Sequence, residues 1–224
     1  MLAPSMGVHM YVTPRHQAIM VAAVALTLAA CAGHRPYVPF GEGITPPRTI
    51  AVLPFDNQTN SVPGALYLRE TMHDHLKEAG YEPRPLEEVD RALSDQFGVS
   101  LGGQVTEEMI PKVGAMLGVD AVLTGTVQKF GTVLALYSEV EAGFAMYESG
   151  SGRKIWEYHD HVKEDTALGR RESNSATLAV GLIASVIERG SGKPLGSVVT
   201  QFYRRMTPRL PSGAGAIPVR RAVD

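Results

Sequence analysis

The chain contains one cysteine among its 224 residues, Cys31, and its place in the sequence indicates its chemistry. A disulfide within the chain is excluded because the thiol has no partner. An uncharged apolar run, residues 18–30, ends directly before the cysteine, and Arg15 and His16 stand just before the run. A basic segment, an apolar segment and small residues at a cleavage point make a secretory signal peptide. The run is too short for a transmembrane anchor, which takes about 20 apolar residues, so we interpret residues 1–30 as a signal peptide.

The residues Leu28-Ala29-Ala30-Cys31 resemble the lipobox of bacterial lipoproteins, a leucine and two small residues before a cysteine. The resemblance implies that the Cys31 thiol carries a diacylglycerol, that the signal is cut before Cys31, and that the new amino terminus is acylated. By resemblance to the sorting rule of enteric bacteria, Ala32 in the next position favours the outer membrane. Two alternatives stay open: an ordinary signal peptide with a chance cysteine, and a true start at Met1, Met6 or Met10.

Two histidines, His159 and His161, stand two apart in a segment that alternates like a β-strand, so both side chains point to one face. Such a pair binds zinc when a third ligand converges on it, and Glu157 lies on the same face. A metal-dependent or other hydrolase that uses these histidines is therefore the alternative function. The competing interpretation is a solvated strand face, because one strand rarely supplies a whole metal site.

A phosphate-binding loop is the remaining chemistry that the sequence suggests, at residues 190–197. Such a loop needs a glycine five places before Gly192, where this chain has Ile187. It also needs a serine or threonine after the lysine, where this chain has Pro194. We therefore expect no nucleotide there, and no cofactor or metal elsewhere. The net charge of −2 gives no electrostatic reason to expect nucleic acid. No catalytic motif is present, and we do not expect an enzyme.

Hydrophobic periodicity predicts the elements that position these residues. The first half of the chain reads, in order, as a buried strand at 49–55, a helix at 64–79, a short strand or edge at 81–85, a helix at 86–97, a helix at 106–117 and a strand at 119–128. In the helix at 106–117, Pro111 conflicts with a cap at Thr106, because proline is tolerated only in the first turn. A kink, or a start nearer Met109, resolves the conflict.

The second half predicts an antiparallel hairpin and then helices. In residues 133–148 the apolar side chains fall on one face and Tyr137, Glu139, Glu141 and Tyr147 fall on the other. A turn at 149–152 leads to the return strand with the two histidines. Helices follow at 176–187 and 195–206. We expect residues 31–48 to be a Pro/Gly-rich tether, 49–206 one domain, and 207–224 a disordered tail.

The helix at 176–187 is apolar nearly all round, and such a helix must be buried on every side. Gly181 costs about 1 kcal/mol in a helix interior relative to alanine, which is reasonable where another backbone approaches closely. We therefore predict that Val180, Gly181 and Leu182 belong to an interaction surface. A wholly internal core helix is the equal alternative.

The order of elements, with "LGVDAVLTGTV" at 117–127 and "SGSGRKIWE" at 149–157, resembles a family of bacterial outer-membrane lipoproteins known as vaccine candidates. It is more distantly similar to the lipoproteins CsgG and LpoB and to the amino-terminal domain of TolB. The resemblance covers residues 49–206. It implies an α/β (α+β) fold like the TolB amino-terminal domain: a small mixed sheet with an antiparallel hairpin, packed by about five helices. Pore formation of the CsgG kind is not expected, because the hairpin lacks the alternation of a lipid-facing barrel strand.

The expected function is accordingly that of a periplasm-facing lipoprotein of the outer membrane, held by lipid at Cys31 and acting through contacts with envelope proteins. Three narrower expectations follow. The protein assists a CsgG-like secretion or envelope-assembly system, it forms a homo-oligomer, and it is exposed at the cell surface. The partner and the pathway are not named by the sequence.

Overall fold

The computed structural model describes residues 37–134, 136–166 and 195–216, all within the unit Pro36–Asp224. These residues build a six-stranded mixed sheet in the order β3-β1-β4-β5-β6, with the short β2 also paired to β4. Strands β1, β2 and β3 lie parallel to their neighbours, whereas β4, β5 and β6 form an antiparallel meander. The strands are β1 (Thr49–Val52), β2 (Asp56–Asn57), β3 (Glu82–Pro83), β4 (Ala121–Val133), β5 (Tyr137–Glu148) and β6 (Lys154–Asp165).

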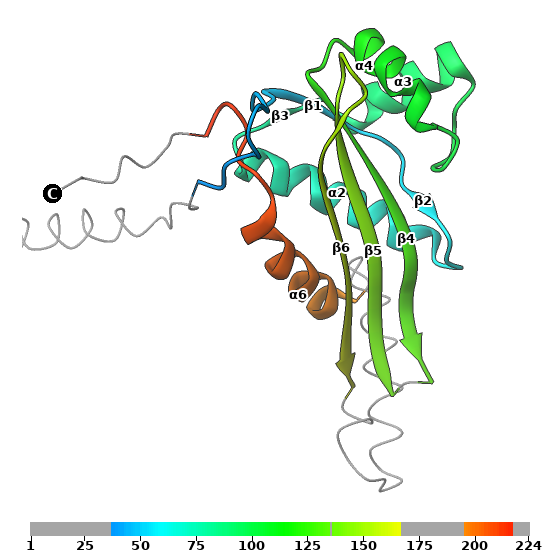
Figure 1. Cartoon of the computed structure of the whole chain (residues 1–224). Coiled ribbons are helices and arrows are strands. Elements are labelled where there is room, and N and C mark those ends of the chain that lie inside the picture. Colours follow the sequence, from blue (N-terminus) through cyan, green and yellow to red (C-terminus); the bar gives the residue numbers. More distant parts are fainter. Residues whose placement is uncertain (1–36, 135, 167–194, 217–224) are drawn as a thin grey trace, which may run out of the picture. The chain divides into compact units, whose positions relative to one another are not determined.

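The described helices complete the predicted mixed α+β fold, which is confirmed. They are α2 (Val62–Glu78), α3 (Leu86–Phe97), α4 (Ile110–Leu117) and α6 (Gly196–Met206), with 3-10 turns at Glu107–Met109 and Thr207–Arg209. The fifth predicted helix, at 176–187, lies outside the described residues. Figure 1 shows the three long strands side by side, with α4 at the end where β1 joins them.

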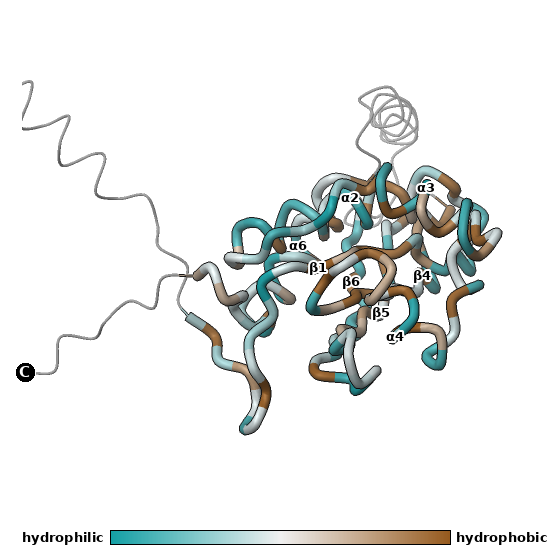
Figure 2. The backbone as a smooth tube through the Cα atoms, turned by 90° about the horizontal axis from the view of Figure 1, so that it is seen from above, coloured by the Kyte–Doolittle hydropathy of each residue, from teal (hydrophilic) through white to brown (hydrophobic). Residues whose placement is uncertain are grey.

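One face of the sheet is covered along its described length by α2 and α6. The apolar side chains that alternate along β4, β5 and β6 point to this face, as the period-two pattern predicted, and they join the buried stripes of both helices. Figure 2 shows α2 and α6 on one side of the strands and α4 on the other. The completely buried members include Leu68, Met72, Leu123, Met146 and Phe202.

The opposite face is covered only near β1. There α3 and α4 bury Ala51, Leu53 and Val122 together with their own apolar residues, among them Val89 and Ile110. Farther along β4, β5 and β6, this face carries polar and small side chains with no described helix over them. We call it the open face. Its members alternate with the core residues, so the same strands build both.

Local sequence explains two departures from the predicted elements. The strand predicted at 49–55 ends at Val52 as β1, and pairing with β4 resumes only in β2 at Asp56, because Pro54 has no backbone N–H for the ladder. The helix predicted from Thr106 begins at Ile110, which places Pro111 in the first turn and removes the conflict. A β-bulge between Val127 and Lys129 lets β4 continue to Val133, five residues past its predicted end.

An ion pair between a buried arginine and a half-exposed aspartate joins α2, α3 and β1. The Arg69 side chain is only 4% exposed and donates to both carboxylate oxygens of Asp90, at 2.9 and 2.7 Å. It also donates twice to the carbonyl of Val52, at 3.2 and 2.8 Å. A planar guanidinium suits this forked geometry, so Arg69 fixes both helices on the end of β1.

The tail prediction is wrong for the residues up to Ala216. Leu210 is completely buried, and backbone bonds join Ser212 to Val38, Gly213 to Ala79 and Ala214 to Pro47. Residues 210–216 therefore close the core beside the start of β1 and the end of α2. The predicted tether therefore contacts the domain at Val38 and Pro47, whose carbonyls accept from the tail, and at Phe40, which packs against the core.

Candidate functional site

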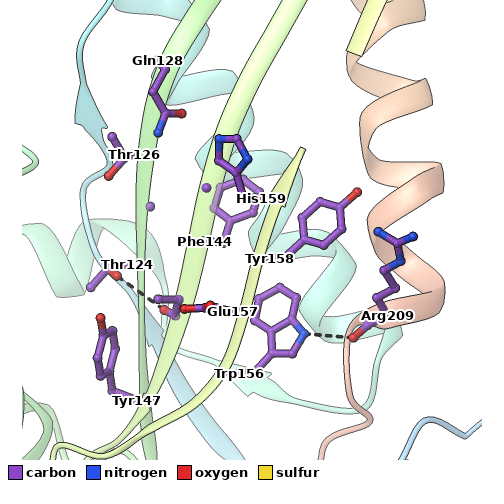
Figure 3. A pocket seen from close by; sticks show the side chains of 13 residues that line it. Thr124, Thr126, Gln128, Phe144, Tyr147, Trp156, Glu157, Tyr158, His159 and Arg209 are labelled. Atoms are coloured by element: carbon purple, nitrogen blue, oxygen red, sulfur yellow. Dashed lines mark hydrogen bonds between the residues drawn. The ribbon is translucent and has the colours of Figure 1, made fainter. Parts of the chain in front are cut away.

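A groove of about 790 Å³ lies along the middle of β4, β5 and β6. Its walls come from all three strands and from Arg209 beside the far edge of β6. Figure 3 shows Thr124, Thr126 and Gln128 on the β4 side, and Glu157 and His159 on the β6 side. The groove lies on the open face.

Small residues of the central strand make the floor of the groove. Gly143 lies between Thr126 and His159 in the sheet, and Ala145 lies between Thr124 and Glu157. Residues paired in an antiparallel ladder lie on the same face. The strands on either side therefore rise as polar walls over a floor that has almost no side chain.

A hydrogen bond between the sheet and the 3-10 turn before α4 closes one end of the groove. The Tyr147 hydroxyl donates to Glu107 at 2.6 Å. Burial and this carboxylate raise the pKa of Tyr147 to about 12, so the tyrosine stays protonated and remains a donor at neutral pH. A second hollow of about 150 Å³ continues past Tyr147 toward Asp56 and Gly103.

A network of charged side chains bounds the other end. Lys129 pairs with Glu141 at 2.9 Å, and His161 bonds Glu139 at 2.9 Å. His159 lies 3.6 Å from Glu141. The hydrogen bond from Lys129 lowers the pKa of Glu141, so this carboxylate is charged over the physiological range.

The predicted histidine pair is therefore on one face of β6, as the spacing indicated, but its neighbours differ from those proposed for a metal. The histidines face Glu139 and Glu141 of β5, while Glu157, the suggested third ligand, pairs with Lys154. Across the residues with described positions, no group of three or more His, Cys, Asp or Glu is arranged to hold a metal ion. The hydrolase alternative gains no support from this geometry.

The β6 edge of the groove carries aromatic and cationic groups. Trp156 and Tyr158 are nearly parallel, with their centroids 6.3 Å apart. The Trp156 indole donates to the carbonyl of Arg209 at 2.9 Å, and the Arg209 guanidinium lies 5.8 Å from the centre of the Tyr158 ring. These contacts join the residues after α6 to the edge strand and fix that wall.

The other predicted site residues, Cys31 and the surface at Val180, Gly181 and Leu182, lie outside the described residues. Sequence reasoning missed the groove. Its signals were present as small residues at 143 and 145 and threonines at 124 and 126, but the strand register was needed to place them together.

Residues 40–193, more than half of the chain, match the model of the GNA1162-like lipoprotein family. The chain belongs to this family. Its membership agrees with the lipoprotein resemblance inferred from the sequence. No curated protein matches the chain. No helix in the portion with described positions is both long and apolar enough to cross a membrane.

Three solved structures are similar to this chain, each with a TM-score below 0.5. The lipoprotein GNA1162 from Neisseria meningitidis is 26% identical, with 65% of this chain and 99% of that chain covered and a TM-score of 0.47. The LpoB C-terminal domain from Salmonella enterica is 19% identical, covering 55% and 87%, with a TM-score of 0.42. A PelC dodecamer from Paraburkholderia phytofirmans is 13% identical, covering 80% and 93%, with a TM-score of 0.40.

Proposed function

We propose that this protein is anchored by lipid at Cys31 in the outer membrane, faces the periplasm, and acts through contacts with other envelope proteins. The observation that carries the proposal is the match of residues 40–193 to a lipoprotein family. The sequence LAAC at 28–31 supports it by supplying the one thiol that lipid transfer requires. Two or three acyl chains would hold the protein firmly, at about 0.8 kcal/mol per buried methylene.

The contact surface that we propose is the open face of β4, β5 and β6. The other face of these strands is used by α2 and α6, and the β1 end is used by α3 and α4, so the fold occupies them. On the open face the fold requires only backbone pairing between strands. The side chains there are not fixed by core packing and can be used to bind a partner. Its paired carboxylates, imidazoles and threonines suit a polar protein contact more than a catalytic step.

Narrower forms of the proposal name the partners. The proposal that the protein assists a CsgG-like secretion or envelope-assembly system rests on the sequence resemblance alone. A second contact surface around Val180, Gly181 and Leu182 rests on the apolar composition of residues 176–187, and a homo-oligomer is one way to cover it.

Fatty-acid labelling tests the anchor. Cys31→Ser should remain an unlabelled, unprocessed precursor, because a hydroxyl is a poor substitute for the thiol in lipid transfer. Ala32→Ser is the matched control beside it and should be labelled and cut like the wild type. Density-gradient separation of the two membranes should then place the labelled protein in the outer one. Equal label in wild type and Cys31→Ser would exclude lipidation at this residue.

A further inference from the structure

Gly125 in β4 and Gly143 in β5 differ in whether the fold leaves room for a side chain. A side chain at Gly125 of β4 would come within 2.6 Å of the Phe55 ring and 2.9 Å of the Phe144 ring, so the core requires glycine there. At Gly143 of β5, a Cβ atom would meet only His159 Cδ2 at 3.4 Å and the Tyr158 carbonyl at 3.8 Å. These are ordinary contacts, and the backbone of Gly143 is not left-handed.

The fold therefore does not need glycine at position 143. Glycine inside a strand is less favourable than alanine, because its backbone loses more conformational freedom on folding. Gly143 pairs with Thr126, next to the irregularity at Val127/Lys129, but the extra residue there is on β4. The extra residue of the irregularity at Met146/Tyr147 is on β6, so β5 itself has none. In a strand that carries no extra residue of its own, a glycine often marks a place where a ligand or another backbone approaches closely. Here that place is the floor of the groove.

The chemistry of the walls selects among ligand classes. Sugars and bases bind by stacking on exposed aromatic faces. Phe144, Tyr147 and Tyr158 are each 6% exposed or less, and the half-buried Trp156 is stacked on Tyr158 and donates its indole N–H to Arg209. The walls instead offer threonine hydroxyls, the Gln128 amide and the His159 imidazole. These groups match the N–H and C=O groups along an extended polypeptide.

Charge at the groove favours a cationic segment. Glu157 lines the groove, and Glu107 and Asp56 line the hollow that continues it. Arg209 stands at the opposite rim over Tyr158, and His159 faces Glu141. Lys154 pairs with Glu157, so the excess negative charge lies in the continuing hollow, where Asp56 and Glu107 stand in a lining without lysine or arginine. Complementary charge steers encounters with a cationic ligand.

We propose that the groove binds an extended polypeptide segment that carries lysine or arginine, with its backbone laid over Gly143 and Ala145. This inference rests on the proposed function and names the partner chemistry of the same surface. A side chain at position 143 would occupy the space of the segment's backbone. A neutral residue at position 157 would remove part of the attraction.

The test uses the mature lipidated protein in a neutral detergent and a fluorescent decapeptide of alternating threonine and lysine, followed by anisotropy. We expect saturable binding that Gly143→Val weakens at least about tenfold and Glu157→Gln weakens about threefold, the scale of one lost polar contact. Gly131→Val is the matched control. It is a strand glycine on the same face with nothing within 4 Å of its Cβ position, outside the groove lining, and should bind within about twofold of wild type.

Folding and charge are controlled separately. If Gly143→Val loses the wild-type circular dichroism spectrum, Gly143→Ala replaces it in the test. Gly143→Ala should keep that spectrum and should still weaken binding. A threonine–glutamate decapeptide should not bind. No saturable binding, equal binding of the two peptides, or unchanged affinity in the Gly143 variants would overturn the cationic-segment inference. The proposed function fails independently, if photo-crosslinking from Thr126 in cells joins no envelope protein.

Discussion

The two ends of β4 lie in different surroundings, although one strand forms both. At Ala121–Leu123, neighbouring side chains point into two separate cores, with Val122 against α3 and α4 and Leu123 against α2 and α6. From Thr124 onward, one set of side chains stays in the core and the other faces the groove. The first region is held from both sides, so its sequence is set by packing. The open region is held from one side, so its polar face can be set by binding.

The difference between the regions predicts which substitutions the fold tolerates. In a doubly covered sheet, any side chain that changes size leaves a cavity or a clash. On the open face, a change alters only the surface that a partner meets. Stability measurements and binding measurements should therefore separate along one strand.

The largest expected effect is a core truncation in the doubly covered region. Leu123→Ala should lower the free energy of unfolding by about 2–5 kcal/mol, because the lost contacts leave a cavity. Thr126→Ala, three residues along on the open face, should change it by no more than about 0.5 kcal/mol. Urea unfolding followed by circular dichroism measures both, and similar losses would remove the distinction between the regions.

The next effect concerns the ion pair that ties both helices to β1. Asp90→Ala leaves the buried Arg69 guanidinium with only the Val52 carbonyl, and should cost about 2–3 kcal/mol of unfolding free energy. Half of the Asp90 side chain is exposed, which keeps the loss below that of a fully buried pair. Glu87→Ala on the same helix is the control and should cost less than about 0.5 kcal/mol. An equal loss in both variants would show that the pair contributes nothing special.

A smaller effect depends on pH. The Asp120 carboxylate accepts the backbone N–H groups of Thr49 and Arg48 at 2.9 and 3.0 Å, and the bond from Thr49 is the main reason that its pKa lies below the ordinary 3.8. A lowered folded-state pKa adds stability above the unfolded value, and this stability disappears as pH falls through the folded value. Asp120→Asn should thus cost about 1 kcal/mol or less at pH 7, given its exposure.

Urea unfolding of wild type and Asp120→Asn at several pH values from 7 to 3 tests the sign. The two midpoints should differ at pH 7 and at pH 5, and they should converge below pH 4. A difference that grows on acidification would contradict the assigned hydrogen bonds.

The smallest effect on stability has the opposite sign. Gly143→Ala should leave the free energy of unfolding unchanged or raise it by up to about 1 kcal/mol, because alanine restricts the unfolded chain and its methyl group has room. Gly125→Ala should destabilise the protein through its clash with Phe55 and Phe144. Thermal unfolding of both variants compares them directly. A clear loss of stability in Gly143→Ala would mean that the fold itself requires this glycine.

Local patterns predicted the elements well where periodicity decides the structure. Alternation along residues 137–148 identified the hairpin and its wet face, and Gly98 and Gly118 end α3 and α4 in the left-handed conformation. The packed tail was not predictable in this way. Its proline and glycine content resembles a disordered segment, and its burial comes from contacts with residues more than 100 positions away.

The candidate site was predicted only in part, for a related reason. The spacing of His159 and His161 placed them on one face, but their partners on β5 follow from the register between strands. The groove depends on the same register, because Thr126, Gly143 and His159 are distant in sequence and adjacent in the sheet. Arg69 likewise reads as one charge on an amphipathic helix until α3 places Asp90 beside it.

Site-specific photo-crosslinking in living cells tests most directly whether the open face is the contact surface. A benzophenone amino acid would replace Thr126 in the groove wall and, as the control, the exposed Glu70 on α2. We predict that the Thr126 position joins a distinct envelope protein, that Gly143→Val abolishes this product, and that the Glu70 position does not form it. No product from Thr126, or the same product from both positions, would contradict the open face as the surface through which this lipoprotein acts.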